Sequence, residues 1–193
     1  MIKTQELLKP IREKVLTWEQ IRKMRIQAFD TFFEAFKPAL NTIYYPGSNT
    51  DISPSETTSF KGSRVIYVDT DEKAIQTLKE KHYEAYLGNA ENFNPGEVNL
   101  LLLLNFYDEK PLKYVVEKGY IMCNDHWTGT LRKILGKNDF ELAGVFTDEN
   151  QELKVDEKTL REEALRINSQ TPNPSRNMAN LFVFRKNKSK FPI

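Results

Sequence analysis

The stretch that decides the fold is Asn41-Thr-Ile-Tyr-Tyr-Pro-Gly-Ser-Asn-Thr-Asp51, in which a short apolar run passes directly into a turn of small residues. Ser53-Pro-Ser-Glu56 follows with an N-cap serine, a proline at the first helical position and a carboxylate suited to a capping box. The order is therefore strand, glycine turn, helix N-terminus. Such a segment directs backbone N–H groups and the positive end of a helix dipole at one point, where nucleotide-like ligands bind.

A second apolar run, Arg64-Val-Ile-Tyr-Val-Asp69, ends in a carboxylate about 20 positions after Gly47. In nucleotide-binding α/β domains, an acid at this distance from the glycine turn accepts hydrogen bonds from ribose hydroxyls. The pattern predicts this role for Asp69. The alternative is a cap for the helix that starts at Thr70 or Asp71, because Asp is also a good N-cap.

The composition indicates one globular domain with an appended helical segment. The chain has 193 residues, 39% of them hydrophobic, and a formal charge of +1, so it shows no clear nucleic-acid footprint. Cys123 is the only cysteine, which excludes an intrachain disulfide. Residues 1–6 lack the apolar core of a signal peptide, and the longest apolar run, residues 100–104, is too short to span a bilayer. We therefore expect a cytoplasmic protein that does not enter a membrane, and the sequence indicates no oligomeric state.

The chain divides into three predicted parts. Residues 1–40 form an N-terminal helical segment packed on the core, residues 41–186 form the α/β domain, and residues 187–193 form a tail. Apolar side chains recur at helical spacing through the first part. We interpret this stripe as a face packed on a sheet, with a partner surface or a lid over a ligand as the alternative. Its members are Trp18, Ile21, Met24, Ala28, Phe29, Phe32, Phe33 and Phe36.

Strands and helices alternate from residue 41 onward, which predicts a mostly parallel sheet with helices on both faces. One of the predicted helices begins at Pro111 and ends at Gly119. Ligands bind such sheets outside the carboxyl ends of the strands. The seven expected strands span residues 42–45, 64–68, 84–87, 98–104, 120–124, 140–147 and 180–185.

The strand ends resemble those of the class I S-adenosylmethionine-dependent methyltransferases, over residues 41–186. The turn Gly47-Ser-Asn-Thr-Asp51 corresponds to the Gly-x-Gly-x-Gly turn of that family, and Asp69 to its acid after the second strand. Gly88-Asn-Ala90 is similar to its Gly-Asp-Ala segment, and Asn105 to the residue that ends its fourth strand. The resemblance implies a Rossmann-like α/β fold with a seven-stranded, mostly parallel sheet, a C-terminal antiparallel strand and the N-terminal helical extension.

The resemblance also implies S-adenosylmethionine as cofactor and a small-molecule ligand site. Two positions depart from the family: Tyr45 replaces an acid, and Asn49 replaces the second glycine. Asn49 can still adopt a left-handed conformation, and Asp51 is a candidate replacement for the missing partner of the cofactor's ammonium. The residues implied to bind the cofactor are Tyr45, Gly47, Ser48, Asn49, Asp51, Asp69, Thr70, Asn89, Ala90 and Asn105.

The candidate catalytic residues are His126 and Asp125, in the segment Cys123-Asn-Asp-His-Trp127. Histidine can act as a base near neutral pH, and the alternative is a polar loop at the end of a strand. The sequence shows no metal-ligand spacing, phosphate loop or nucleophile elbow.

Three functions are compatible with these patterns. The first is an S-adenosylmethionine-dependent methyltransferase acting on a small acceptor. The second is a catalytically inactive Rossmann-like binding or interaction protein, which the eroded glycine turn favours. The third is an NAD-dependent oxidoreductase, which the closing pair of strands argues against.

Overall fold

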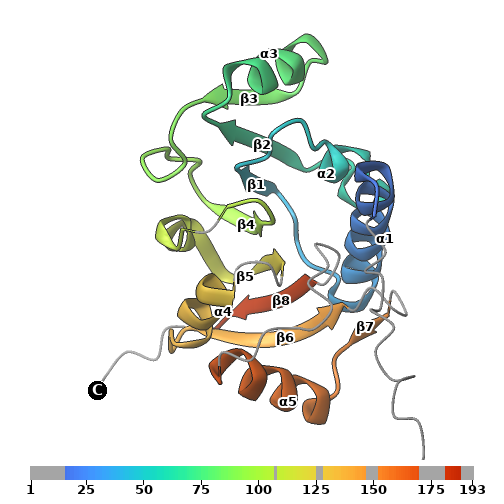
Figure 1. Ribbon diagram of the computed structural model, residues 1–193, viewed down its shortest axis with the longest axis vertical. Coiled ribbons are helices and arrows are strands. Elements are labelled where there is room, and N and C mark those ends of the chain that lie inside the picture. Colours follow the sequence, from blue (N-terminus) through green and yellow to red (C-terminus); the bar gives the residue numbers. More distant parts are fainter. Residues whose placement is uncertain (1–15, 107, 125–127, 147–151, 170–180, 188–193) are drawn as a thin grey trace, which may run out of the picture.

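A mixed sheet of eight strands organises the molecule (Figure 1). The computed structural model describes residues 16–106, 108–124, 128–146, 152–169 and 181–187. The strands are β1 (Thr42–Pro46), β2 (Arg64–Asp69), β3 (Glu84–Leu87), β4 (Val98–Leu103), β5 (Val115–Asn124), β6 (Phe140–Phe146), β7 (Leu153–Lys154) and β8 (Leu181–Lys186). The helices are α1 (Trp18–Phe36), α2 (Ser53–Glu56), α3 (Glu72–Glu80), α4 (Thr128–Leu135) and α5 (Glu157–Asn168), with 3-10 turns η1 (Thr58–Phe60) and η2 (Lys110–Tyr114).

The strand order is β3-β2-β1-β4-β5-β8-β6-β7. Strands β1 to β5 pair in parallel, whereas β8 runs antiparallel to both β5 and β6, and β7 runs antiparallel to β6. The predicted α/β class and the antiparallel C-terminal strand are confirmed. The predicted number of seven strands is wrong, because β7 adds an eighth. It has two residues, too few to show the alternation by which a strand is recognised in sequence.

The crossover between β4 and β5 contains no α-helix among the described residues. We predicted a helix from Pro111 to Gly119, but the chain makes only the turn η2 and enters β5 at Val115. Val115 and Val116 are β-branched and favour extended backbone, and Val115 pairs with Val98 of β4. Pro111 therefore starts a short 3-10 turn. The valines after it favour a strand, so the turn does not continue into a helix.

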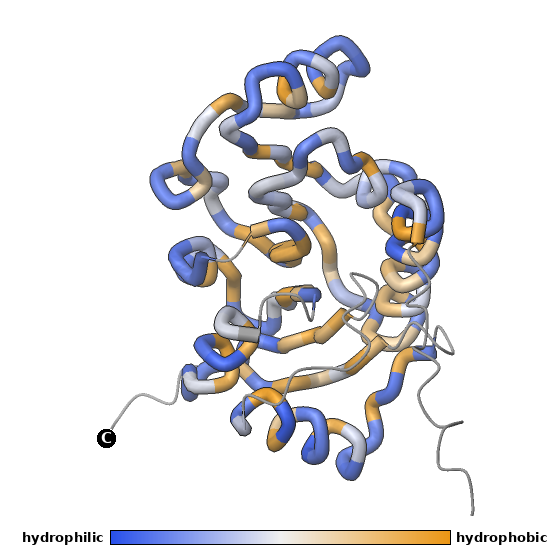
Figure 2. Tube along the Cα trace, viewed as in Figure 1, coloured by the Kyte–Doolittle hydropathy of each residue, from blue (hydrophilic) through white to orange (hydrophobic). Residues whose placement is uncertain are grey.

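Helices cover both faces of the sheet, as predicted. On one face, α1 and α3 pack over the parallel strands, and on the other face α4 and α5 pack over the C-terminal strands. All residues of β4 except Asn99 are fully buried between these layers, which agrees with its nearly continuous apolar sequence. In Figure 2 the hydrophobic colour runs along the central strands, and most of the hydrophilic colour lies in the helices and loops around them. Within the described residues, no helix has both the length and the apolar character needed to cross a membrane.

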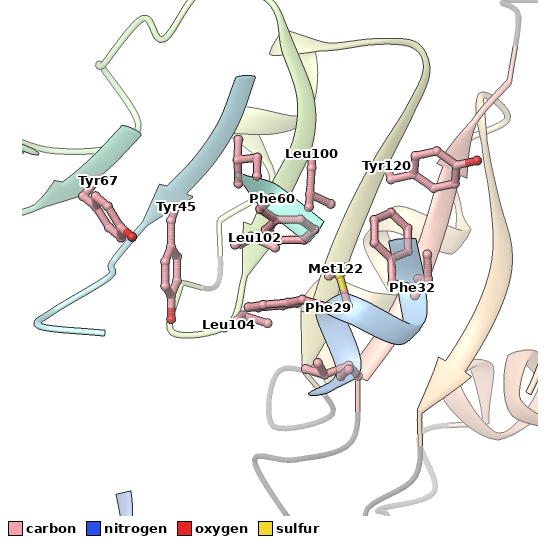
Figure 3. Close-up of a cluster of buried hydrophobic side chains, with 14 of the residues drawn as sticks. Phe29, Phe32, Tyr45, Phe60, Tyr67, Leu100, Leu102, Leu104, Tyr120 and Met122 are labelled. Atoms are coloured by element: carbon pink, nitrogen blue, oxygen red, sulfur yellow. The ribbon is translucent and has the colours of Figure 1, made fainter. Parts of the chain in front are cut away.

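Helix α1 lies against the face of the sheet that carries Tyr45 of β1 and Tyr67 of β2. Its N-terminus is fixed by a capping box between Thr17 and Gln20. Phe29 and Phe32 are fully buried and pack with Leu100 and Leu102 of β4 and with Met122 of β5 (Figure 3). Most of the apolar stripe is therefore a packed face. Trp18 differs, because 44% of it is exposed at the start of the helix.

Candidate ligand-binding site

The turn after β1 depends on Gly47. Its backbone has φ +64°, and a Cβ placed there would lie 3.1 Å from the carbonyl oxygen of Asn105 and 3.2 Å from Cβ of Phe106. Only glycine meets both demands without strain. Asn49 has φ 51°, the left-handed conformation expected of it. The chain thus keeps the tight turn although it lacks a second glycine.

Asp69 is held by two main-chain groups. Its Oδ2 accepts a hydrogen bond from the N–H of Asn49 at 2.7 Å, and its Oδ1 accepts one from the N–H of Asp71 at 2.9 Å. The cap of α3 is Asp71, which accepts from the N–H groups of Lys73 and Ala74. The alternative of Asp69 as the N-cap is therefore wrong. Its half-buried carboxylate ties the glycine turn to the loop after β2, and each oxygen keeps a lone pair for a further donor.

A cleft of about 710 Å³ lies outside the carboxyl ends of β1 to β4. This is the edge at which open α/β sheets bind ligands. Its only charged lining residues among those described are Asp69 and Glu91, and Glu91 also pairs with Lys110. The cleft therefore offers carboxylates, amides and aromatic rings, with a balance that favours neutral or cationic ligands. The lining residues are Trp18, Gly47, Asn49, Thr50, Asp69, Thr70, Asn89, Glu91, Asn105 and Phe106.

The structure brings six of the ten predicted cofactor residues into this cleft: Gly47, Asn49, Asp69, Thr70, Asn89 and Asn105. The other four lie buried beside or beneath it: Tyr45, Ser48, Asp51 and Ala90. Their predicted roles toward a cofactor stay predictions. Asp125 and His126 lie outside the described residues.

Asp51 points into the protein, where it forms a buried ion pair with Arg25 of α1. Its Oδ2 also accepts a hydrogen bond from the Tyr45 hydroxyl at 2.7 Å, and its Oδ1 accepts one from the N–H of Ser53 at 3.0 Å. Burial raises the pKa of Tyr45 well above its ordinary value, so this hydroxyl stays protonated and can donate. Asp51 thus satisfies a buried cation and stabilises the start of α2.

Arg25 connects the buried side chains of Asp51 and Tyr45 to the cleft. One terminal nitrogen, Nη1, contacts Tyr45 and Asp51, and the other, Nη2, donates to Oδ1 of Asn105 at 3.2 Å. The Asn105 amide donates in turn to the Tyr45 hydroxyl at 3.0 Å. The guanidinium also lies over the ring of Trp18, 5.2 Å from its centroid. Two residues of the cleft wall are therefore in contact with one buried cation.

Sequence reasoning missed Thr50, Glu91 and Phe106 as cleft residues and Arg25 as the group behind them, and it placed Trp18 near a ligand only through the alternative of a lid. A signal for Arg25 was present, because it stands in the apolar stripe of α1, four positions from both Ile21 and Phe29. An arginine at a core position of an amphipathic helix needs a partner.

No protein-family model matches the chain, and no curated protein matches it. Solved structures do resemble it. The plantazolicin methyltransferase BpumL in complex with SAH is 13% identical, with a TM-score of 0.57 over 86% of this chain and 84% of that one. The plantazolicin methyltransferase BamL, in complex with a triazolic desmethylPZN analog and SAH, is 15% identical, with a TM-score of 0.53 over 87% and 85%.

A third similar structure, StiE O-MT, is 11% identical, with a TM-score of 0.52 over 89% of this chain and 75% of that one. These likenesses show that the chain has the fold of the S-adenosylmethionine-dependent methyltransferases, so the family resemblance read from the strand ends is confirmed at the level of fold.

Proposed function

We propose that this chain binds S-adenosylmethionine in the cleft and methylates a small acceptor. The observation that carries the proposal is the carboxylate of Asp69, fixed by two main-chain N–H groups at the cleft, one strand away from Gly47. A fixed acid at the end of β2 is suited to accept hydrogen bonds from both hydroxyls of a ribose. The SAH held by the similar structures supports the same ligand class.

The adenosine half fits the β2 and β3 side of the cleft. Asn89 follows β3, and its Oδ1 accepts a hydrogen bond from the N–H of Glu91 at 2.8 Å. This bond orients the Asn89 amide, whose N–H groups can then donate to a ring nitrogen of adenine. Asp69 and Asn89 therefore supply an acceptor for the ribose and a donor for the base.

The methionine half fits the side of the cleft formed by Gly47, Asn105 and Trp18. The bound cofactor supplies a methyl group on a sulfonium cation. The charged side chains that line the cleft among the described residues are two carboxylates, so the lining does not repel a cation. The chain's own contribution is to hold donor and acceptor close together and in line. We propose His126 or Asp125 as the base for an acceptor that must lose a proton.

The same charges argue against NAD. Its pyrophosphate is anionic, and no Lys or Arg lines the cleft within the described ranges. Helix α2, which follows the glycine turn, has only four residues and so presents little dipole to a phosphate. Two observations favour the alternative of a catalytically inactive binding protein. Tyr45 replaces the acid expected at the end of β1, and Asp51 is ion-paired with Arg25.

Calorimetric titration of the chain with S-adenosylmethionine, SAH and NAD tests the proposal. We expect saturable binding of the first two ligands at one site and no heat from NAD. If neither S-adenosylmethionine nor SAH binds, the proposal is wrong.

An assay with methyl-labelled S-adenosylmethionine then distinguishes an active enzyme from an inactive binding protein. Transfer of label to a small molecule in a fractionated extract, lost in Asp69→Ala, identifies an enzyme. Binding without transfer in any fraction favours the inactive protein.

A further inference from the structure

Arg25 is almost fully buried, yet it contacts both the interior and the cleft. It is 1% exposed. Its Nη1 donates hydrogen bonds to the buried side chains of Tyr45 and Asp51, and its Nη2 donates one to Asn105, which lines the cleft. The planar guanidinium directs two separate nitrogens to these two sets of partners, whereas lysine would offer one ammonium nitrogen to all of them.

The Asn105 amide is oriented by its two neighbours. Its oxygen accepts from Arg25 and its nitrogen donates to Tyr45, which distinguishes the two ends of the amide and fixes its plane. The hydrogen bonds of the described residues use one of the two N–H groups of this amide. The second N–H group has no acceptor among the described residues and would donate to a ligand in a direction that Arg25 and Tyr45 determine.

Trp18 is fixed from the same point. It is 44% exposed and lines the cleft, and the Arg25 guanidinium lies over its ring. Cation–π contact holds an exposed aromatic ring in place more firmly than solvent does. Trp18 and Asn105 come from α1 and from the end of β4, and Arg25 is in contact with both.

We propose that Arg25 is a positioning residue that sets the cleft wall formed by Asn105 and Trp18, and thereby the recognition of the methionine half of the cofactor. The inference rests on the proposed function. The strand order β3-β2-β1-β4 separates this wall from Asn89, which follows β3 at the other end of the cleft. Arg25 therefore acts on the methionine half and leaves the adenosine half unaffected.

The variant that tests the proposal is Arg25→Lys. Its ammonium can still pair with Asp51, so the buried carboxylate keeps a cation, but it cannot also reach Asn105. We expect SAH to bind roughly tenfold more weakly, the loss of about one hydrogen bond. Adenosine, which lacks the homocysteine half, should bind with an affinity within about twofold of that of the wild type.

Arg22→Lys is the matched control. Arg22 lies three positions earlier on the same helix and is ion-paired with Glu56 of α2, and neither residue lines the cleft. This variant makes the same chemical change and also weakens a tie between α1 and the segment after the glycine turn. We expect it to leave both the SAH and the adenosine affinities unchanged.

The double variant Arg25→Met/Asp51→Asn protects the test against misfolding, because it removes both buried charges together. It should bind adenosine normally and SAH weakly. Equal weakening of both ligands in Arg25→Lys, or no change in either, overturns the positioning role while the proposed function stands. If the wild-type chain binds neither SAH nor adenosine, the proposed function fails, and this inference fails with it.

Discussion

Asp51 and Asp69 stand near the ends of neighbouring strands, and their surroundings are opposite. Asp51 is 1% exposed and pairs with the buried guanidinium of Arg25. Asp69 is half-buried at the cleft, and within the described ranges its hydrogen bonds come from the N–H groups of Asn49 and Asp71. A carboxylate that neutralises an internal cation contributes to the stability of the fold. A carboxylate fixed by uncharged main-chain donors keeps its charge for a ligand.

The largest expected effect concerns the buried acid. Asp51→Ala leaves Arg25 buried without its counter-charge and should lower the free energy of unfolding by about 3–5 kcal/mol. Urea denaturation measures this. The control is Asp71→Ala, which removes the exposed N-cap of α3 and should cost about 1 kcal/mol. Equal losses in the two variants would mean that the buried pair does not stabilise the fold.

The acid at the cleft should show the reverse pattern. Asp69→Ala should weaken S-adenosylmethionine binding by about 2–4 kcal/mol, because two hydrogen bonds to a charged acceptor are lost with some recovery from water. Its effect on stability should be smaller than that of Asp51→Ala. Titration calorimetry on Asp69→Ala and Asp71→Ala separates the two neighbouring acids. An unchanged affinity would leave Asp69 as a tie between loops.

A smaller effect is expected at the turn that faces Asp69. Gly47→Ala forces a side chain into the left-handed region and against Asn105, so it should lower stability by about 1–2 kcal/mol and also weaken binding. Gly62 supplies the control: its φ is +91°, but a Cβ there meets nothing within 4 Å. Gly62→Ala should lower stability and leave binding intact. If both variants bind equally well, the turn does not contact the ligand.

The smallest effect tests enzyme against inactive relic. In a working site Asn49 makes a contact of its own, so Asn49→Gly should weaken S-adenosylmethionine binding by about 1 kcal/mol, one neutral hydrogen bond. Glycine keeps the N–H that Asp69 accepts and suits the observed φ of 51°. We expect the weaker binding. Tighter binding in the variant would mean that the Asn49 side chain obstructs an eroded site.

The strand ends were predictable because parallel strands share one carboxyl edge. Gly47, Asp69 and Asn105 are far apart in sequence, yet each directly follows an apolar run, and the structure gathers them in one cleft. Local chemistry was equally informative at Asn49, where a left-handed residue was expected and is found. These inferences need only a strand pattern and the conformational preferences of single residues.

Other features depend on contacts that a periodic pattern does not contain. The sequence offered Asp51 as a partner for the cofactor's ammonium, and the structure turns it inward toward Arg25, 26 positions earlier. Pro111 suggested a helix, but pairing of Val115 with Val98 on the neighbouring strand selects extended backbone. At Pro111 the neighbouring strand overrides the local signal. At Asp51 the sequence did not show the contact with Arg25, and the role of Asp51 toward a cofactor stays a prediction.

The contacts of Arg25 also set an order of events on the ribosome. Asp51 lies 26 residues after Arg25, and Asn105 lies 80 residues after it. At about 5–20 residues per second, the interval between synthesis of Arg25 and of Asn105 is about 4–16 s. During that interval α1 carries an arginine in its apolar face without its partner at the end of β4. The cleft wall is complete only after β4 and Asn105 have emerged. Helix α1, the first helix of the described chain, therefore gains the last hydrogen bond of Arg25 late in synthesis.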